Sequence, residues 1–324
     1  MLMSVLLFAV GLVLLIKGGD WFVDGATGIA KRFNLPDIVV GATVVSIGTT
    51  LPEVMVSTTG ALQGSGAMAY GNAIGSIICN TALIAAISIV CNPGPVNTKS
   101  MKTPALFFFA SAGLYCLASY VLGTFPRWMG FVMLGIFVVY TVLTVRNGLK
   151  NPDAAEEEEE EEGKQRTLVM ELGLLVVGAA VIAVGADLLV EHGQIIAIGL
   201  GVPETVVALL FVALGTSLPE LVTTITSLRS GHASLGVGNV IGANVFNLVL
   251  VSGVAVSLAP FDVPCENTLL NTGLNMSLVF EIPVMLGVMS LMIFPTLASK
   301  KLARWQGFLL LGIYLAFCVC QFVL

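Results

Sequence analysis

Two copies of one polar phrase in an otherwise apolar chain decide the fold. They read Gly48-Thr49-Thr50-Leu51-Pro52-Glu53 and Gly215-Thr216-Ser217-Leu218-Pro219-Glu220. Each is followed by a second matched phrase, which ends at Asn80 in the first copy and at Asn247 in the second. Glu220 lies 167 residues after Glu53, and Asn247 lies 167 residues after Asn80, so the copies align without a gap. The sequence therefore predicts two equivalent halves with one glutamate at the same place in each.

Both glutamates lie in long apolar segments, where an acidic side chain is costly. A charged side chain at the centre of a bilayer costs about 2.5–3.5 kcal/mol or more, and an ionisable residue there marks a functional site by default. The cost occurs here twice, at matched positions. This pattern predicts a transporter and not an enzyme.

The composition indicates a membrane protein. Of 324 residues, 56% are hydrophobic and 10% are charged, and the mean hydropathy is +0.97. Soluble domains carry roughly 25% charged residues, and a spanning helix needs about 20 apolar residues. We therefore predict an all-α polytopic membrane protein. Its ten transmembrane helices are expected at residues 2–30, 36–62, 67–90, 103–122, 128–148, 168–198, 204–229, 234–258, 281–298 and 305–323.

The basic residues predict the orientation in the membrane. Of 14 Lys and Arg residues, all except Lys17 and Arg127 fall in alternate connections, beginning with the first. Cytoplasmic connections carry the excess of basic residues, so both termini are predicted outside a plasma (inner) membrane. Five helices per half then give two inverted five-helix repeats, a recurring architecture of secondary transporters.

An acidic linker separates the two predicted repeats. The first repeat is expected at residues 1–150, the linker at 151–166 and the second repeat at 167–324. Seven consecutive glutamates, Glu156–Glu162, account for the net charge of −6, since the chain without them would carry +1. A block of like charge repels itself and stays disordered. We expect a solvated cytoplasmic linker, and a weak Ca²⁺-sensing or cation-concentrating role is the alternative.

Each phrase gathers oxygen atoms where a helix is interrupted. Because proline has no N–H, Pro52 and Pro219 leave the carbonyls four residues earlier without a helical donor. In a bilayer such carbonyls persist only where they line a cavity or meet a ligand. Hard oxygen ligands suit Ca²⁺ and alkali cations better than zinc or copper. The side chains that supply further oxygens are Thr49, Thr50, Glu53, Asn80, Thr216, Ser217, Glu220 and Asn247.

The sequence places no cation beside either glutamate. There is no Lys or Arg within residues 33–92, and only Arg229 lies within residues 193–264. Lys17 could approach only through tertiary structure, and a local i, i+3 pair with Asp20 is the alternative. A buried carboxylate without a partner must take a proton or a mobile cation. Two carboxylates balance one Ca²⁺ or two Na⁺, so competition between these ions would be the basis of exchange.

These residues resemble the paired α-repeats of the calcium:cation antiporter superfamily, in its prokaryotic sodium/calcium-exchanger branch. The resemblance covers about residues 18–83 and 185–250, and the ten-helix organisation extends it to the whole chain. The phrase Gly-Thr-Ser/Thr-Leu-Pro-Glu, followed at fixed spacing by Gly-Asn-x-Ile-Gly-Ser/Ala, is specific when it is present twice.

The resemblance implies alternating exchange of Ca²⁺ for Na⁺ at one midplane site. Glu53 and Glu220 would bind both ions in turn, and the long helices near residues 2–30 and 168–198 would slide past the rest. Thr49, Thr50, Thr216 and Ser217 would supply hydroxyl or backbone oxygens, with Asn80 and Asn247 at the centre. Ser76 and the carbonyls of Ser46 and Ala213 would complete the flanking Na⁺ sites.

Some residues depart from the family pattern or have another expected role. Both central amides, Asn80 and Asn247, are asparagines where potassium-dependent relatives rely on an aspartate, which argues against K⁺ co-transport. Ala243 lacks the hydroxyl of its counterpart Ser76. Asn72 and Asn239, in glycine-flanked helices, are expected to bond backbone or a partner helix instead of an ion.

Three other functions could draw on some of the same residues. A Ca²⁺/H⁺ antiporter would use the same glutamates as proton acceptors and differs in Na⁺ dependence. A passive cation channel would need the oxygen ligands but not the coupled repeats. An intramembrane aspartyl protease would need glycine where Lys17 precedes Gly18-Gly19-Asp20, and gives no reason for a second Leu-Pro-Glu. The expected partners are the lipid bilayer and the transported Ca²⁺ and Na⁺, with no cofactor, no nucleic acid and a monomeric transport unit.

Overall fold

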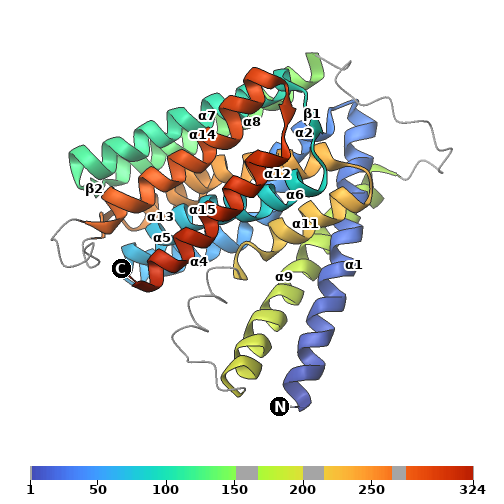
Figure 1. Ribbon diagram of the computed structural model, residues 1–324, viewed down its shortest axis with the longest axis horizontal. Coiled ribbons are helices and arrows are strands. Elements are labelled where there is room, and N and C mark those ends of the chain that lie inside the picture. The colour runs from blue at the N-terminus through green and yellow to red at the C-terminus, as the bar shows by residue number, and fades with distance from the viewer. Residues whose placement is uncertain (1, 151–166, 200–214, 265–274, 324) are drawn as a thin grey trace.

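The computed structural model describes residues 2–150, 167–199, 215–264 and 275–323, and this part of the chain is largely helical (Figure 1). The predicted linker 151–166 lies outside the described residues. In the first half the helices are α1 (Leu2–Phe33), α2 (Asp37–Val40), η1 (Gly41–Val45), α3 (Ser46–Thr49), α4 (Leu51–Leu62), α5 (Gly66–Cys79), η2 (Asn80–Ala85), α6 (Ala86–Cys91), α7 (Thr98–Cys116), η3 (Leu117–Leu122) and α8 (Arg127–Lys150). In the second half they are α9 (Leu168–Gly199), α11 (Leu218–Arg229), α12 (Ala233–Phe246), η5 (Asn247–Val251), α13 (Ser252–Leu258), η7 (Ser277–Glu281), α14 (Ile282–Ser299) and α15 (Arg304–Val323).

The described helices are long and apolar enough to make this a polytopic membrane protein. Eight helices pass that test singly, and the bent pair Asp37–Thr49 and Leu51–Leu62 adds a ninth. These nine correspond to nine of the ten predicted spans. The other predicted span, 204–229, begins outside the described residues and ends as α11. The total of ten helices therefore stays a prediction.

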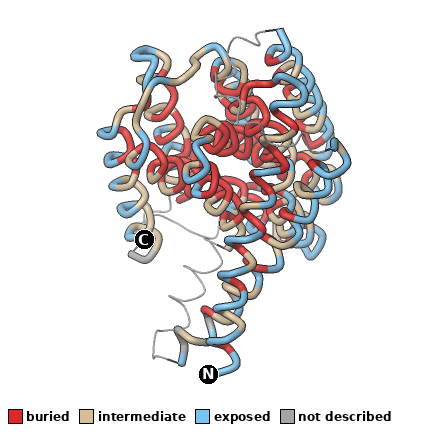
Figure 2. Tube along the Cα trace, turned by 90° about the vertical axis from the view of Figure 1, so that its right-hand side faces the viewer, coloured by how far each residue is buried: buried red, intermediate tan, exposed pale blue. Residues whose placement is uncertain are grey.

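Two spans form the centre of the molecule. In the most apolar part of Gly66–Cys91 and of Ala233–Leu258, 72% and 83% of the residues are buried, against 17–39% in the six other single spans. Figure 2 shows the buried residues gathered in the middle, surrounded by exposed outer helices. An apolar helix that is exposed in a membrane protein faces lipid, so the two central spans are the ones enclosed by protein.

The first helix of each half packs against the other along its length, and Figure 1 shows α1 and α9 side by side. A Cβ added to Gly11 would lie 2.9 Å from the Gly185 carbonyl oxygen, and one added to Gly178 would lie 2.9 Å from the Gly18 carbonyl oxygen. Since the early residue of one helix faces the late residue of the other, α1 and α9 run antiparallel. Small residues allow this close approach of two helix backbones in a bilayer.

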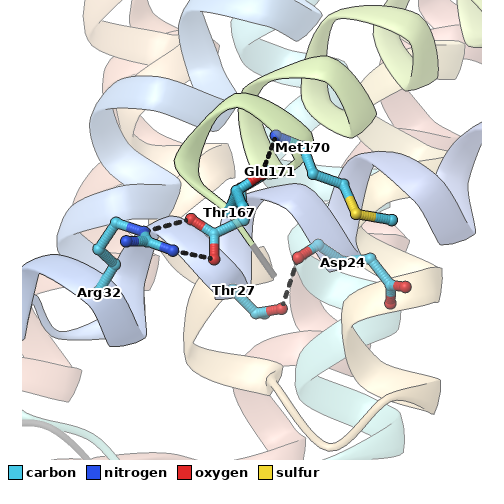
Figure 3. Close-up of polar contacts among 6 residues, drawn as sticks. All are labelled: Asp24, Thr27, Arg32, Thr167, Met170 and Glu171. Atoms are coloured by element: carbon cyan, nitrogen blue, oxygen red, sulfur yellow. Dashed lines mark hydrogen bonds and ion pairs between the residues drawn. The ribbon is translucent and has the colours of Figure 1, made fainter. Parts of the chain in front are cut away.

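An ion pair ties the end of α1 to the start of α9 (Figure 3). Arg32 donates from Nε to Glu171 Oε2 at 2.8 Å and from a terminal guanidinium nitrogen to Oε1 at 3.3 Å. The Glu171 side chain is 6% exposed and the Arg32 side chain is 35% exposed. Thr167, whose hydroxyl accepts from the Met170 N–H at 3.3 Å, caps the first turn of α9 beside this pair. The planar guanidinium matches a carboxylate at two points, so the pair fixes the register of the two helices.

Two short strand pairs link connections from different halves. Strand β1 (Gly94–Pro95) pairs antiparallel with β4 (Lys301–Leu302), and β2 (Thr124–Phe125) pairs antiparallel with β3 (Phe261–Asp262). Each pair joins the connection after one span to a connection in the other half of the chain. The two pairs thereby hold the peripheral helices α7, α8, α14 and α15 in place around the central spans.

The helix that carries the first polar phrase packs very closely on α12. A Cβ on Gly41 would overlap the carbonyl oxygen of Leu235, and one on Gly238 would overlap the carbonyl oxygen of Ile38. Glycine is therefore required at both positions by the contact itself. At the end of this contact His232 Nδ1 lies 2.6 Å from Asp37 Oδ2. The close packing sets the position of η1 and α3, and hence of Thr49 and Thr50.

Candidate ion-binding site

The polar phrases stand at matched breaks in their helices. Helix α3 ends at Thr49 and α4 begins at Leu51, with a bend of 45° between the two parts of the span. Thr50 has φ −84° and ψ −4°, and its counterpart Ser217 has φ −88° and ψ 3°. Both lie in the sparsely populated region between helix and turn that functional residues often occupy. The prolines stand in the first turn of α4 and of α11, where a missing N–H is tolerated.

The second phrases end in matched changes of helix type. A π-helix begins at Asn80 in the first half (η2) and at Asn247 in the second half (η5). Widened π turns inside α-helices are rare and are frequent at functional sites. The two amides predicted as central ligands therefore each stand where the backbone hydrogen-bond pattern changes.

The predicted ligands are buried and lack hydrogen-bond partners. Among these ligands, both carboxylate oxygens of the two glutamates, both amide atoms of the two asparagines, and the hydroxyls of Thr50 and Ser217 have no partner among the described residues. All of these side chains are at most 1% exposed. Buried polar side-chain atoms are normally hydrogen-bonded, so an unpaired group of this size indicates a binding site. It consists of three matched pairs, Thr50 with Ser217, Glu53 with Glu220, and Asn80 with Asn247.

No described cationic side chain balances the two glutamates. The described ion pairs lie elsewhere, and Lys17 pairs with Asp20 at 3.7 Å on the exposed surface of α1, as the local alternative predicted. Glu53 and Glu220 lie close enough to interact electrostatically. Two carboxylates that repel each other in a buried site need a cation or a proton between them.

The site is assembled from both halves. Within each half the glutamate helix packs on the asparagine helix, α4 on α5 and α11 on α12. Across the halves, α4 contacts η5 and α11 contacts η2. Each glutamate helix therefore packs beside the π-helix that carries the asparagine of the opposite half. This crossing brings the three matched pairs of polar residues into one region.

The other predicted ligands differ from this group in burial or in having hydrogen-bond partners. Thr49 is buried and bonded to Asn239, and Thr216 is half-buried and bonded to Asn72. The Ser46 carbonyl oxygen accepts the Thr50 N–H at 3.0 Å and also lies 3.5 Å from the Thr49 hydroxyl, a second donor. Of the last two predicted ligands, Ser76 is buried within α5, at 3% exposed, and Ala213 lies outside the described residues.

Asn72 and Asn239 make structural hydrogen bonds, as predicted. Asn72 donates from Nδ2 to the Glu53 carbonyl oxygen at 3.2 Å and to Ser57 Oγ at 2.8 Å. Asn239 donates from Nδ2 to Thr223 Oγ1 at 2.9 Å. Sequence reasoning missed the two hydroxyl partners, Ser57 and Thr223. They are not related by the offset of 167, since the counterpart of Ser57 is residue 224, so the repeat gave no signal for them.

A further buried link joins the central spans to α14. Asn244 donates from Nδ2 to Thr81 Oγ1 at 2.7 Å and lies 3.1 Å from the sulfur of Met289. The counterpart of Asn244 is Ile77. The link is thus confined to one half, and it helps to hold η2, which begins one residue before Thr81, against α12.

The sequence matches the family described as sodium/calcium exchanger protein over residues 3–146 and 170–323. The chain belongs to this family. Sodium/calcium exchanger MaX1 of Methanosarcina acetivorans is 30% identical over an alignment 352 positions long, which covers 98% of this chain and 98% of that protein. Inner membrane protein YrbG of Escherichia coli is 31% identical over 276 residues, covering 81% of this chain and 82% of that protein.

A solved structure of the same family has the same fold. The sodium-calcium exchanger NCX_Mj, soaked with Na⁺ and Sr²⁺, superposes with a TM-score of 0.79 at 32% identity and covers 97% of both chains. The predicted membership of the prokaryotic sodium/calcium-exchanger branch is therefore confirmed. The chain is a membrane-embedded cation antiporter of this family.

Proposed function

We propose that the chain exchanges Ca²⁺ for Na⁺ by alternating access, with both ions competing for one midplane site on Glu53 and Glu220. The observation that carries this proposal is the pair of fully buried carboxylates without a cationic partner among the described residues. Carboxylate, hydroxyl and amide oxygens are the ligands that Ca²⁺ prefers. One Ca²⁺ or two Na⁺ would balance the two charges, so either ion would exclude the other.

The remaining ligands are assigned by their place around the glutamates. Thr50, Ser217, Asn80 and Asn247 would contact the central ion, since their side chains are buried there without partners. Thr49 and Thr216 would contribute hydroxyls from the preceding residue. In the flanking Na⁺ sites, the ligands proposed from the resemblance are Ser76 and the carbonyls of Ser46 and Ala213.

The packing supports the further proposal of inverted repeats. Helices α1 and α9 open the two halves and run antiparallel, as the first helices of inverted repeats must. The strand pairs support it as well: β1 and β3 are related by the offset of 167, and each pairs with a strand of the opposite half. We propose that residues 1–150 and 167–324 are the two repeats and that α1 and α9 slide together during exchange.

The proposed setting in the cell follows from charge. The alternate connections that carry the basic residues would face the cytoplasm, with both termini outside and the acidic linker 151–166 inside. Arg32 and Glu171 meet across α1 and α9, which supports placing the first connection and the start of the second half on the same side. We propose a monomeric transport unit in the plasma or inner membrane.

Transport in proteoliposomes tests the exchange directly. Vesicles are loaded with Na⁺ and diluted into Na⁺-free medium with radioactive Ca²⁺, and matched vesicles are loaded with K⁺ or carry an imposed pH gradient. Uptake that requires internal Na⁺ and ignores the pH gradient is the expected result. Uptake driven by the pH gradient without Na⁺ would instead establish the Ca²⁺/H⁺ antiporter, which would use the same glutamates.

The two glutamates are tested in the same vesicles. Glu53→Gln and Glu220→Gln remove one charge each while keeping the side-chain shape, and each is expected to abolish exchange in protein that still inserts and folds. Asp20→Asn, on the exposed surface of α1, is the matched control and should retain exchange. Normal exchange in either glutamine variant would contradict the site assignment.

A further inference from the structure

The two helical asparagines of the glycine-flanked phrases make the same cross-half contact. Thr49 in the first half donates from Oγ1 to Asn239 Oδ1 in the second half at 3.2 Å. Thr216 in the second half donates from Oγ1 to Asn72 Oδ1 in the first half at 3.4 Å. Thr216 and Asn239 each lie 167 residues after Thr49 and Asn72 respectively. The contact therefore occurs twice, with the roles of the two halves exchanged.

Each asparagine is anchored by its amide nitrogen to the glutamate helix of its own half. Asn72 donates from Nδ2 to the carbonyl oxygen of Glu53 itself, at 3.2 Å. Asn239 donates from Nδ2 to Thr223 Oγ1 at 2.9 Å, and Thr223 in turn donates to the carbonyl oxygens of Pro219, at 2.9 Å, and Glu220, at 3.1 Å. A chain of hydrogen bonds thus runs from the threonine of one half to the Leu-Pro-Glu turn of the other half.

The direction of these bonds is fixed by the acceptors. A carbonyl oxygen only accepts, so Asn72 must turn its NH₂ group to Glu53 and its Oδ1 to Thr216. Thr223 uses its single proton on the backbone carbonyls, so it accepts from Asn239 Nδ2, and Asn239 Oδ1 is left for Thr49. The Thr216 hydroxyl therefore donates its proton to Asn72, and the nearer acceptor for the Thr49 hydroxyl is Asn239 Oδ1 at 3.2 Å, with the Ser46 carbonyl oxygen at 3.5 Å. Their oxygen lone pairs stay free, which is the state in which a hydroxyl serves as a cation ligand.

We propose that Asn72 and Asn239 are reciprocal positioning residues, each of which orients the hydroxyl ligand of the opposite half and ties it to the glutamate turn of its own half. The inference rests on the proposed ion site. Neither asparagine needs to touch the ion, because each acts through its threonine. In this arrangement a cation that binds Glu220 also meets the Thr49 hydroxyl, which Asn239 holds in a fixed orientation. In the same way, a cation that binds Glu53 meets the Thr216 hydroxyl, which Asn72 holds.

Double-mutant cycles on equilibrium Ca²⁺ binding to the purified full chain test the proposal. Thr49→Val and Asn239→Leu preserve side-chain volume and remove the hydrogen bond from either end. Each single variant is expected to weaken Ca²⁺ binding by about fivefold to tenfold, the range of one hydrogen bond. The double variant is expected to bind no more weakly than the weaker of the two single variants. The Thr216→Val and Asn72→Leu cycle is expected to behave in the same way.

The crossed pairs are the matched control. Thr49→Val with Asn72→Leu, and Thr216→Val with Asn239→Leu, combine residues whose hydrogen bonds in the described structure join them to other partners. Their effects are expected to multiply, since independent sites add in free energy. A purely structural role for the asparagines would instead lower the amount of folded protein in every combination, without distinguishing matched from crossed pairs.

The outcomes separate this inference from the proposed function. Suppose that Glu53→Gln loses Ca²⁺ binding, but that the effects of the two substitutions on Ca²⁺ affinity multiply in the matched pairs as they do in the crossed pairs. The positioning role is then wrong and the site assignment stands. If Glu53→Gln binds Ca²⁺ as the wild type does, the site itself is misassigned and the inference falls with it. Should Asn239→Leu fail to fold, because Asn239 is fully buried, the half-buried pair of Asn72 and Thr216 carries the same test.

Discussion

At the scale of single residues, the site consists of polar atoms that the folded protein leaves unpaired. The hydroxyls of Thr50 and Ser217 and the carboxylates of Glu53 and Glu220 are buried without partners among the described residues. Leaving one buried polar group unpaired costs about 1–3 kcal/mol. A binding site can retain this cost because the bound ligand supplies the missing interactions. Functional sites commonly lower the stability of the folded protein in this way.

Replacing the unpaired hydroxyls should therefore stabilise the ion-free protein. Thr50→Val removes an unpaired oxygen with little change in volume, and Ser217→Ala removes its counterpart. In Ca²⁺-free, Na⁺-free buffer, the melting temperature of either variant is expected to rise, by the equivalent of about 1 kcal/mol. Added Ca²⁺ should raise it by less than in the wild type, because a ligand oxygen is missing.

Thermal unfolding in detergent, with and without Ca²⁺, checks this expectation. Thr144→Val is the matched control, since Thr144 also carries a buried, unpaired hydroxyl but lies on α8. It should stabilise the protein without reducing the Ca²⁺-dependent shift. An undiminished shift in Thr50→Val would exclude Thr50 from the site.

The sequence indicated the residues of the proposed site more readily than their local structure. Glu53, Glu220, Asn80 and Asn247 were found because they recur at one offset and because polar residues in apolar segments are rare. The sequence did not indicate that the amide of Asn239 would be anchored by Thr223, since partners of this kind depend on how neighbouring helices face each other and follow no repeat.

At the scale of elements, the helix boundaries followed from hydrophobicity, but the π-helices did not. The segments Gly66–Cys91 and Ala233–Leu258 read as continuous apolar helices, and nothing in their composition marks the change at Asn80 or Asn247. The break at Thr50 was predictable, because Pro52 removes a helical donor. A π turn depends on tertiary packing of the segment, and is therefore invisible to a local pattern.

The contact between η1 and α12 predicts a sharp effect of one methyl group. Gly41→Ala places a Cβ against the carbonyl oxygen of Leu235, so α12 must move away from the helix that carries Thr49. Folded protein after purification and the melting temperature are both expected to fall. In Gly113→Ala, on the exposed side of α7, the added Cβ meets nothing within 4 Å. This control should be neutral or slightly stabilising, since alanine is the better helix former. Equal behaviour of the two variants would contradict the packing described.

The ion pair between α1 and α9 predicts an order of effects. Arg32→Met leaves the buried Glu171 carboxylate without its bidentate partner, whereas Glu171→Gln leaves a partly exposed guanidinium that water reaches. Removing the partner of a buried charge is the more harmful change. The melting temperature should therefore fall more in Arg32→Met than in Glu171→Gln. The reverse order would show that the carboxylate is not buried in the folded protein.

At the scale of the whole molecule, the sequence predicted family membership and a polytopic membrane fold, and both are confirmed. Charge in the connections supplies the predicted orientation, which no contact within the chain determines, because a protein fold is the same whichever way it is inserted. The antiparallel packing of α1 and α9 and the paired strands relate the two halves to each other. Their relation to the membrane has to be measured.

Labelling of single cysteines measures the orientation. Cys91 is exposed at the end of α6, in the third connection, which is predicted to be cytoplasmic. In a variant that keeps only Cys91, an impermeant maleimide should label the protein after cell lysis and not in intact cells. Gln63→Cys in a cysteine-free background lies in the second connection and should be labelled in intact cells. The opposite pattern would invert the predicted topology.

Exchange as proposed requires Na⁺ and Ca²⁺ to compete for one site built on Glu53 and Glu220. Equilibrium binding of radioactive Ca²⁺ to the purified chain, titrated with Na⁺ at constant ionic strength, tests it most directly. We expect one Ca²⁺ per chain, complete displacement by Na⁺ with a Hill coefficient above one, and loss of binding in Glu53→Gln and Glu220→Gln. Ca²⁺ binding that Na⁺ does not displace, or that survives in both glutamine variants, would contradict it.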